Sequence, residues 1–431
     1  MAQSRASATT FGDFLEAISG AGTLFVFDIY ADIFSAMQIF GNGLLRLVIC
    51  GTALPDSFFE ILNGLPRLRY LNLRQCIVPA APNRLATPPP LETLALVDLT
   101  PRCYGVYSAY FVHLFNGLTT ISIDHGPHEH DFQQLSVPPL ECEPVRITLG
   151  AAAEQVSCTH YTTALSHFRL HALEELVIII PGLSCWPFAC YDNFPLEDVP
   201  CLATMPRLRT LMAPPHIVEL LARKTSQLQS VAVQGPGLAR VFCVLGALER
   251  HGQSMQHLAI NTRRWDDDLV PYISQRFPEL QSLEILYHED EPSERSLEVI
   301  GHNLRKLTKL NTLHIHRFPH GIYRPWKDHV DNYRQPSCQH RASNSIEPST
   351  KLSDIGLVST AVPTLVRVKL RHDFESGHGW ARDNADSPWY ESVYRVECTS
   401  AREIQEDMRT EYSPMGYYGA LVLHHLAPLE S

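Results

Sequence analysis

The stretch LPDSFFEILNGLPRLRYLNL, residues 54–73, combines two different apolar periodicities. Its first half places Phe58, Ile61 and Leu65 at the spacing of one helix face. Its second half, LRYLNL, follows the frame Φ-x-x-Φ-x-Φ, in which Φ is an apolar residue. The last two Φ of the frame alternate, so they point to one face of a short strand. The stretch therefore predicts a short helix followed by a short strand.

The same frame recurs along nearly the whole chain. Good copies begin at Leu44, Leu68, Leu91, Leu118, Leu173, Leu208, Leu228, Met255, Leu280, Leu310 and Leu365. Weaker copies, LFVFDI, PVRITL and VYRVEC, begin at Leu24, Pro144 and Val393. Most copies lie 20 to 30 residues apart, and many intervening segments have a helical apolar pattern. Stacked strand-plus-helix units predict an α/β solenoid, a horseshoe with parallel concave strands and convex helices.

This repeat resembles the leucine-rich-repeat family, in its intracellular variety with a helix in each unit. That variety often has Cys or Asn three residues after the strand, where this chain has Cys76 in LRYLNLRQC. Other copies depart from this pattern, with Leu99, Gly126 and Phe318 at the equivalent position. The irregular repeats resemble the leucine-rich-repeat domains of fungal F-box-type proteins, over roughly residues 20–400.

The segment LPDSFFEILNGL also resembles the start of an F-box, the helical module that docks such proteins on a ubiquitin ligase. An F-box needs a bundle of helices, whereas here the strand LRYLNL follows Leu65 within a few residues. We therefore predict a repeat helix and no F-box in this chain. A similar helix pattern, FGDFLEAI, lies at Phe11–Ile18, where a solenoid usually has a polar cap. We expect that the N-terminus is truncated relative to its relatives, or that the gene model lost its first part.

How closely each segment follows the repeat pattern predicts the domain organisation. We expect an N-terminal, partly degenerate repeat or cap in 1–43 and the leucine-rich-repeat solenoid in 44–316. A long irregular loop or insertion with several prolines follows in 317–352. The last repeats then occupy 353–398, and a C-terminal cap or tail occupies 399–431.

Bulk composition restricts the classes of function. Apolar residues make up 45% of the 431 residues, which is typical of a globular chain. Lys and Arg number 35 against 46 Asp and Glu, and the net charge of −11 argues against a nucleic-acid binder. The 11 cysteines form no CxxC pair. The sequence has neither the uninterrupted apolar run of a signal peptide nor that of a membrane span. We expect an intracellular protein, cytoplasmic or nuclear, with no membrane partner.

Strand alternation predicts which side chains face a partner. On an early strand these are Tyr70, Asn72 and Arg74. On the late strands they form a basic strip of His314, His316, Arg367, Lys369 and Arg371. Such a strip would attract an acidic or phosphorylated segment of a protein through charge-assisted hydrogen bonds. The alternative interpretation is that these cations only solvate exposed strand ends.

The insertion contributes further candidate contacts. Its aromatic residues include Tyr323 and Trp326, which alternate with Arg and Lys in the composition of a recognition loop. The insertion directly follows the strand that carries His314 and His316. We therefore predict that the partner-binding site lies on the late strands and this loop.

Motifs for catalysis or metal binding are weak. HGPHEHD, residues 125–131, holds three histidines and two acids but lacks the paired separation of structural zinc ligands. No GxSxG, P-loop or GxGxxG motif occurs in the sequence. We predict no enzyme, no cofactor and no metal site.

The sequence thus predicts a protein-binding leucine-rich-repeat module. The F-box-type resemblance implies the substrate-recognition part of a cullin-RING ubiquitin ligase receptor, which would bind a ligase adaptor only if a docking helix is present. One alternative is a stand-alone scaffold or inhibitor with no link to ubiquitin. The other is a hydrolase with an unrecognised motif.

Overall fold

The structure is a computed structural model in which the chain divides into two compact units. Unit 1 comprises Met1–Pro181 and Pro195–Arg207, and unit 2 comprises Gly182–Phe194 and Leu208–Ser431. The residues that the structure describes are 23–27, 37, 43–79, 85–97, 99–101, 108–125, 142–151, 165, 168–179, 205–233, 238–289, 292–317, 358, 361–373, 378–384, 386–387 and 390–393.

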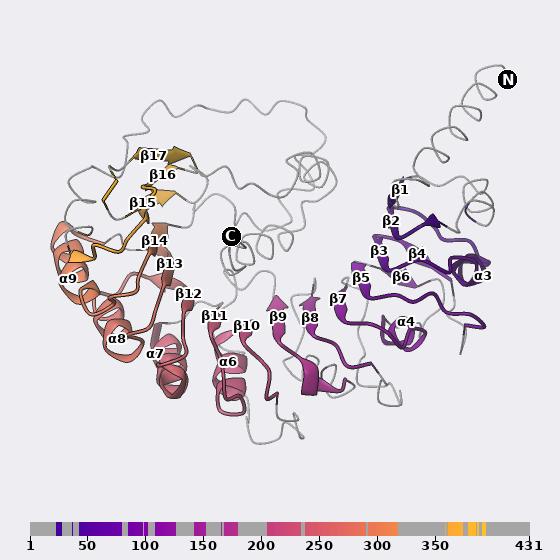
Figure 1. Ribbon diagram of the computed structural model, residues 1–431, viewed down its shortest axis with the longest axis horizontal. Coiled ribbons are helices and arrows are strands. Elements are labelled where there is room, and N and C mark those ends of the chain that lie inside the picture. Colours follow the sequence, from indigo (N-terminus) through magenta and orange to yellow (C-terminus); the bar gives the residue numbers. More distant parts are fainter. Residues whose placement is uncertain are drawn as a thin grey trace, which may run out of the picture. The chain divides into compact units, whose positions relative to one another are not determined.

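Unit 1 is built on a parallel sheet (Figure 1). Among its described residues, the strand order is β1-β2-β3-β5-β7-β8-β9, and every neighbouring pair is parallel. The strands are Thr23–Phe27 (β1), Arg46–Cys50 (β2), Tyr70–Arg74 (β3), Thr93–Val97 (β5), Thr120–His125 (β7), Arg146–Ala151 (β8) and Glu175–Ile179 (β9). The weaker sequence copies at Leu24 and Pro144 thus form the strands β1 and β8.

The connections of unit 1 carry its helices and a second small sheet. The helical segments are Phe58–Asn63 (α3), Ser108–His113 (α4) and the 3-10 helix Leu170–Ala172 (η3). Two short strands, Ile77–Val78 (β4) and Thr100–Pro101 (β6), pair in parallel just after β3 and β5. The repeats of β3 and β5 therefore leave the main sheet through similar turns.

Helix α3 contains the core of the segment LPDSFFEILNGL. It lies between β2 and β3 along the chain, and its ring of Phe59 lies 5.2 Å from the ring of Phe111 in α4. Its buried side chains are Phe58, Phe59, Ile61 and Leu62. One short helix with a buried apolar face leads directly into the next strand, so this segment is a repeat helix. The structure gives no support to its interpretation as the start of an F-box.

The turn after β3 fixes one repeat to the one before it. The buried Cys76 thiol donates to the backbone carbonyls of Ile49, at 3.4 Å, and of Arg74, at 3.2 Å. Burial raises the pKa of this thiol to about 11, so it keeps the proton that it donates. Gln75 adopts a positive φ of 49°, which turns the chain toward that buried position. Cys76, at the position that the leucine-rich-repeat pattern marks, therefore links its own turn to the strand of the preceding repeat.

Unit 2 repeats the same architecture with longer helices (Figure 1). Its parallel strands are Thr210–Ala213 (β10), Ser230–Val233 (β11), His257–Arg264 (β12), Ser282–Glu289 (β13), Thr312–Arg317 (β14) and Arg367–Asp373 (β15). Its helical segments are Pro215–Ala222 (α6), Leu238–Leu248 (α7), the 3-10 helix Glu249–His251 (η6), Leu269–Arg276 (α8) and Glu294–Leu304 (α9). Within unit 2, the helices α6 to α9 lie on one side of these strands (Figure 1).

The described part of unit 2 ends in antiparallel strands rather than in a further parallel repeat. His378–Ala381 (β16) pairs antiparallel with β15, and Tyr390–Val393 (β17) pairs antiparallel with β16. The Arg382 guanidinium donates to the carbonyls of Leu365 and Pro363, which fixes the end of β16 against the start of β15. The weak copy VYRVEC begins at the last residue of β17, and its other residues lie outside the described part.

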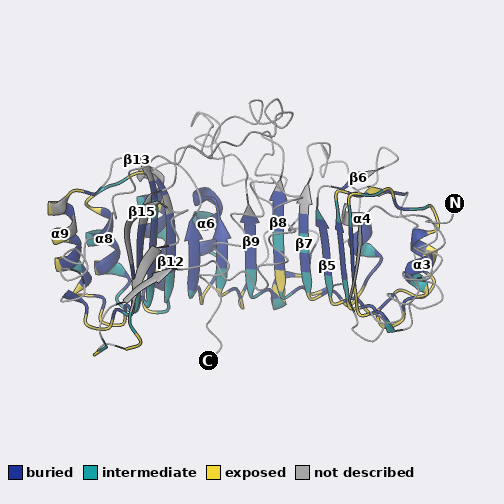
Figure 2. Ribbon diagram, turned by 90° about the horizontal axis from the view of Figure 1, so that it is seen from above, coloured by how far each residue is buried: buried dark blue, intermediate teal, exposed yellow. Residues whose placement is uncertain are grey.

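The apolar positions of the frame form the core of each unit. Leu71 and Leu73 of β3, like Leu283 and Ile285 of β13, are fully buried. In Figure 2 the strands are mostly dark blue, and the exposed yellow residues gather on turns and helices. The predicted α/β leucine-rich-repeat solenoid, with parallel strands and intervening helices, is confirmed.

Several predicted domains fall largely outside the described residues. These are the N-terminal region 1–43, of which β1 is the main described part, the insertion at 317–352 and the C-terminal region 399–431. Their boundaries stay predictions.

Candidate functional site

The strand face of a unit is the face of its sheet that points away from the helices. On β3 in unit 1, strand alternation places Tyr70, Asn72 and Arg74 on this face. The side-chain amide of Asn72 donates to the Tyr70 hydroxyl at 3.2 Å, and the guanidinium of Arg46 lies 4.6 Å from the centroid of the Tyr70 ring. Two of the three early candidates, Tyr70 and Asn72, are therefore held together by contacts within the unit.

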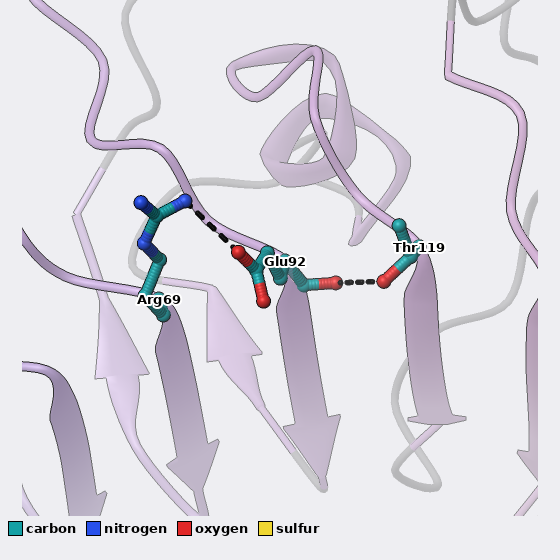
Figure 3. Close-up of polar contacts among 3 residues, drawn as sticks. All are labelled: Arg69, Glu92 and Thr119. Atoms are coloured by element: carbon teal, nitrogen blue, oxygen red, sulfur yellow. Dashed lines mark hydrogen bonds and ion pairs between the residues drawn. The ribbon is translucent and has the colours of Figure 1, made fainter.

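The residues that directly precede the strands of unit 1 satisfy one another. Figure 3 shows Arg69 before β3, Glu92 before β5 and Thr119 before β7. A guanidinium nitrogen of Arg69 lies 2.9 Å from a carboxylate oxygen of Glu92, and the Thr119 hydroxyl donates to the Glu92 carbonyl at 3.1 Å. Arg146 pairs in the same way with Glu175 on the next strand, at 3.3 Å. These exposed pairs contribute little stability, but they occupy the arginines.

In unit 2 the structure brings the late candidate residues onto two neighbouring strands. Arg367 of β15 lies opposite Thr312 of β14, and Lys369 lies opposite His314. Arg367 is half-buried, whereas His314 is only 3% exposed. The structure describes the backbone of Lys369 but not its side chain.

The register between β14 and β15 shifts by one residue beyond this point. Ile315 lies opposite Leu370, but His316 lies opposite His372, so Arg371 falls in the shift. Strict alternation from the frame had placed Arg371 beside His316. The side chains of His316 and Arg371 are not among the described atoms.

An acidic residue that the sequence reasoning missed belongs to the same row. Glu284 of β13 lies opposite His314 and is 8% exposed. The row across β13, β14 and β15 is therefore Glu284, His314 and Lys369, so the strip is not uniformly basic. The signal was present in LQSLEI, because Glu284 occupies the x between the last two apolar positions of that copy.

Arg367 differs from the arginines of unit 1 in its surroundings. Within the described residues, its guanidinium forms no ion pair and no hydrogen bond, while its backbone N–H donates to Asn311 at 3.0 Å. Arg69 and Arg146 both contact carboxylates of their own unit. Arg367 is thus a half-buried cation on a sheet, with its bidentate donor group available to an anion.

The remaining candidates are located only in part. Tyr323 and Trp326 lie outside the described residues, as do most residues of HGPHEHD. In the part of the chain that the structure describes, no cluster of His, Cys, Asp or Glu could hold a metal ion. No described helix combines the length and the apolar character that a bilayer span requires.

Comparisons with known proteins add little beyond the fold. Neither a protein-family model nor a curated protein matches the chain. Internalin InlF from Listeria monocytogenes is 14% identical with a TM-score of 0.29, over 65% of this chain and 82% of the internalin chain. The plant peptide hormone receptor RGFR1, solved in complex with RGF2, is 15% identical with a TM-score of 0.20, over 68% of this chain and 33% of the receptor chain. Values this low assign neither a family nor a partner.

Proposed function

We propose that this chain is a non-catalytic leucine-rich-repeat module that binds another protein through the strand face of unit 2. The observation that carries the proposal is the position of Arg367. The residue is half-buried, and no described residue of the chain supplies its guanidinium with an anion. Charge-assisted hydrogen bonds to a partner carboxylate or phosphate would use its donors.

The proposed partner offers an acidic or phosphorylated segment to this face. The backbone register places Lys369 two residues beyond Arg367 on the same strand and opposite His314. Two cations on one short strand can share a phosphate or two neighbouring carboxylates. His316 and Arg371 extend the proposed contact toward the end of the strands.

Two further groups of residues are proposed as secondary contacts with the partner. Tyr70, Asn72 and Arg74 form a patch on unit 1, where the Oδ1 atom of Asn72 is buried without a hydrogen-bond partner. Tyr323 and Trp326 are proposed as aromatic anchors from the insertion, because aromatic side chains dominate contact energies at protein interfaces.

The finer function is either a substrate receptor of a cullin-RING ubiquitin ligase or a stand-alone scaffold. The packing of α3 inside unit 1 favours the scaffold, because the segment that resembles an F-box start is used there as a repeat helix. Affinity purification of the chain from its own cells, followed by mass spectrometry, separates the two. Recovery of a ligase adaptor and cullin supports the receptor, and recovery of another protein without ligase subunits supports the scaffold.

Charge reversal tests the proposed surface. The triple variant R367E/K369E/R371E should lose most partner capture while keeping the circular dichroism and the melting temperature of the parent chain. R295E is the matched control, because Arg295 is exposed on helix α9. The proposal is wrong if the triple variant and R295E capture the partner equally well at low and at physiological salt.

A further inference from the structure

Four consecutive strands of unit 2 begin with the same kind of dipeptide. The last residue before each strand and the first residue within it are Gln229–Ser230 at β11, Gln256–His257 at β12, Gln281–Ser282 at β13 and Asn311–Thr312 at β14. We call these four dipeptides the polar track. Every residue in it can donate and accept hydrogen bonds, and none carries a formal charge at neutral pH. Burial lowers the pKa of His257, which keeps its ring neutral.

The backbone places both residues of each dipeptide at the start of the strand. The N–H groups of Gln256 and His257 both donate to the Gln229 carbonyl, at 2.7 and 3.0 Å. Gln281 and Ser282 donate in the same way to the Gln256 carbonyl. Because the two N–H groups of each dipeptide share one carbonyl acceptor, the strict alternation of side chains begins only after the dipeptide. The side chains of Gln256 and His257 are accordingly both half-buried. Neighbouring dipeptides are about 4.8 Å apart, the spacing of paired strands.

The hydrogen-bonding capacity of the track is largely unused inside the described part of the chain. There, the side-chain amides of Gln229, Gln256 and Gln281 form no hydrogen bond. The Ser230 Oγ and His257 Nδ1 atoms are buried without a partner, and Ser230 is only 4% exposed. At the far end, Thr312 donates to Asn311 Oδ1 at 2.8 Å. Buried polar atoms without partners are costly and rare, so their presence in one row points to a ligand.

The equivalent row of unit 1 shows the opposite arrangement. Arg69, Glu92 and Thr119 stand before their strands at the position that the glutamines hold in unit 2 (Figure 3). Arg69 and Glu92 carry opposite charges and form an ion pair, and the neutral Thr119 donates to the Glu92 carbonyl. The neutral and unsatisfied row is therefore a property of unit 2 and not of the repeat in general.

Two arginines flank the polar track. Arg209 precedes β10 and is exposed, and Arg367 opens β15. Among the described residues, neither guanidinium has an ion-pair partner. They are separated by five strand spacings, or about 24 Å along the sheet. An extended peptide at about 3.4 Å per residue covers this length with about seven residues.

We propose that the polar track binds an extended segment of a protein partner that crosses strands β10 to β15. The main-chain amides of the segment bond to the side chains of the track, and two acidic groups about seven residues apart pair with Arg209 and Arg367. This inference rests on the proposed function and deepens it, because it states the spacing of charges and the main-chain contacts that the partner needs. Carboxamides suit this task since each can donate to a carbonyl and accept from an N–H of the peptide.

Synthetic peptides test the spacing directly. Fluorescein-labelled peptides carry two glutamates that are four, seven or ten positions apart, with glycine and serine elsewhere, and fluorescence anisotropy measures their binding to the full chain at low salt. The peptide with a spacing of seven should bind most tightly. R209E and R367E should each reduce its affinity to that of a peptide with one glutamate. Affinity that does not depend on spacing, or no binding of the seven-position peptide, overturns the proposal.

Substitutions in the track test the main-chain contacts. Q256A and Q229A should each weaken binding of the seven-position peptide by about threefold to tenfold, the effect of one neutral hydrogen bond. Q275A is the matched control, because Gln275 is exposed on helix α8, and it should have no effect. If R367E abolishes partner capture while R209E, Q229A and Q256A leave it unchanged, the proposal of the polar track is overturned and the proposed function stands. Partner capture that R367E leaves unchanged overturns the proposed function itself.

Discussion

Glu284 of β13 lies directly opposite His314 of β14, and both side chains are more than nine-tenths buried. Lys369 occupies the next position in this row, on β15. Glu284, His314 and Lys369 thus occupy paired backbone positions on three neighbouring strands. The acid reduces the positive potential of the surface that Arg367 and Lys369 provide, so the face is less basic than the late strands alone would make it.

The variant E284Q should strengthen the capture of an acidic partner. The amide keeps the shape of the side chain but removes one acidic group from the row that the backbone register continues to Lys369, so affinity at low salt should rise by about threefold to tenfold. The effect should shrink as salt increases, because the Debye length falls to about 8 Å at physiological ionic strength. E298Q is the matched control on the exposed surface of α9. Weaker capture by E284Q would mean that the carboxylate itself contacts the partner.

Two buried thiols should make the stability of the fold depend on alkaline pH. Burial raises the pKa of Cys76 and of Cys142 from 9.0 to about 11. Both thiols stay protonated in the folded state while those of the unfolded chain ionise. The free energy of unfolding should therefore be unaffected below pH 9 and fall between pH 9 and 11, by up to about 1.4 kcal/mol per pH unit for each thiol.

Urea unfolding at a series of pH values measures this effect. The variant C76A should reduce the alkaline slope by up to about 1.4 kcal/mol per pH unit and should also be less stable at pH 7, because two backbone carbonyls lose their donor. Exposed Cys243 provides an internal reference, since thiol reagents should modify it in the folded chain long before Cys76. An alkaline slope that C76A leaves unchanged would contradict the assignment to this thiol.

The variant F59A should destabilise unit 1. Phe59 is buried in α3 and packs against Phe111 of α4, so its removal leaves a cavity that costs about 3–5 kcal/mol. F111A should have a similar effect, and the double variant should lose less than the sum, because the two rings share one contact. Thermal unfolding of the three variants checks this. A stable F59A chain that loses only a ligase adaptor would restore the F-box interpretation of this helix.

The elements of the fold could be predicted because they depend on local pattern. Each copy of Φ-x-x-Φ-x-Φ that lies fully in the described part became a strand, and the helical half of LPDSFFEILNGL became the helix α3. A buried strand face and a buried helix face need the same apolar residues at the same spacing in every repeat. The pattern therefore carries this information even where individual repeats are irregular.

The candidate site could be predicted only in part, because it depends on register between strands. The frame placed Arg367 and Lys369 on the strand face, but the shift that displaces Arg371 arises between two strands about 55 residues apart in sequence. The contact of Arg46 with Tyr70 likewise joins neighbouring repeats and leaves no mark in either one. Glu284, in contrast, could be found from the sequence, because it stands between the last two apolar positions of LQSLEI.

A comparison of two glycines in unit 2 tests how closely its helices pack. Gly252 follows η6, and a Cβ atom there would clash with the backbone carbonyl oxygen of Arg276, at the end of α8. Backbone atoms cannot move aside cheaply, so G252A should destabilise the fold by about 1–3 kcal/mol. Gly246 lies inside α7, where a Cβ would meet only the Tyr272 hydroxyl at 3.6 Å. G246A should therefore be neutral or stabilise the chain by up to about 1 kcal/mol, because alanine favours helix.

Urea unfolding of both variants measures the contrast in one experiment. G252A should lower the urea midpoint of unfolding, whereas G246A, the same change six residues earlier, should preserve or raise it. Because neither glycine has a positive φ, backbone strain does not account for a loss of stability in G252A, whereas the close approach of the Arg276 carbonyl does. Equal midpoints for G252A and G246A would mean that η6 and the end of α8 are further apart than the structure places them.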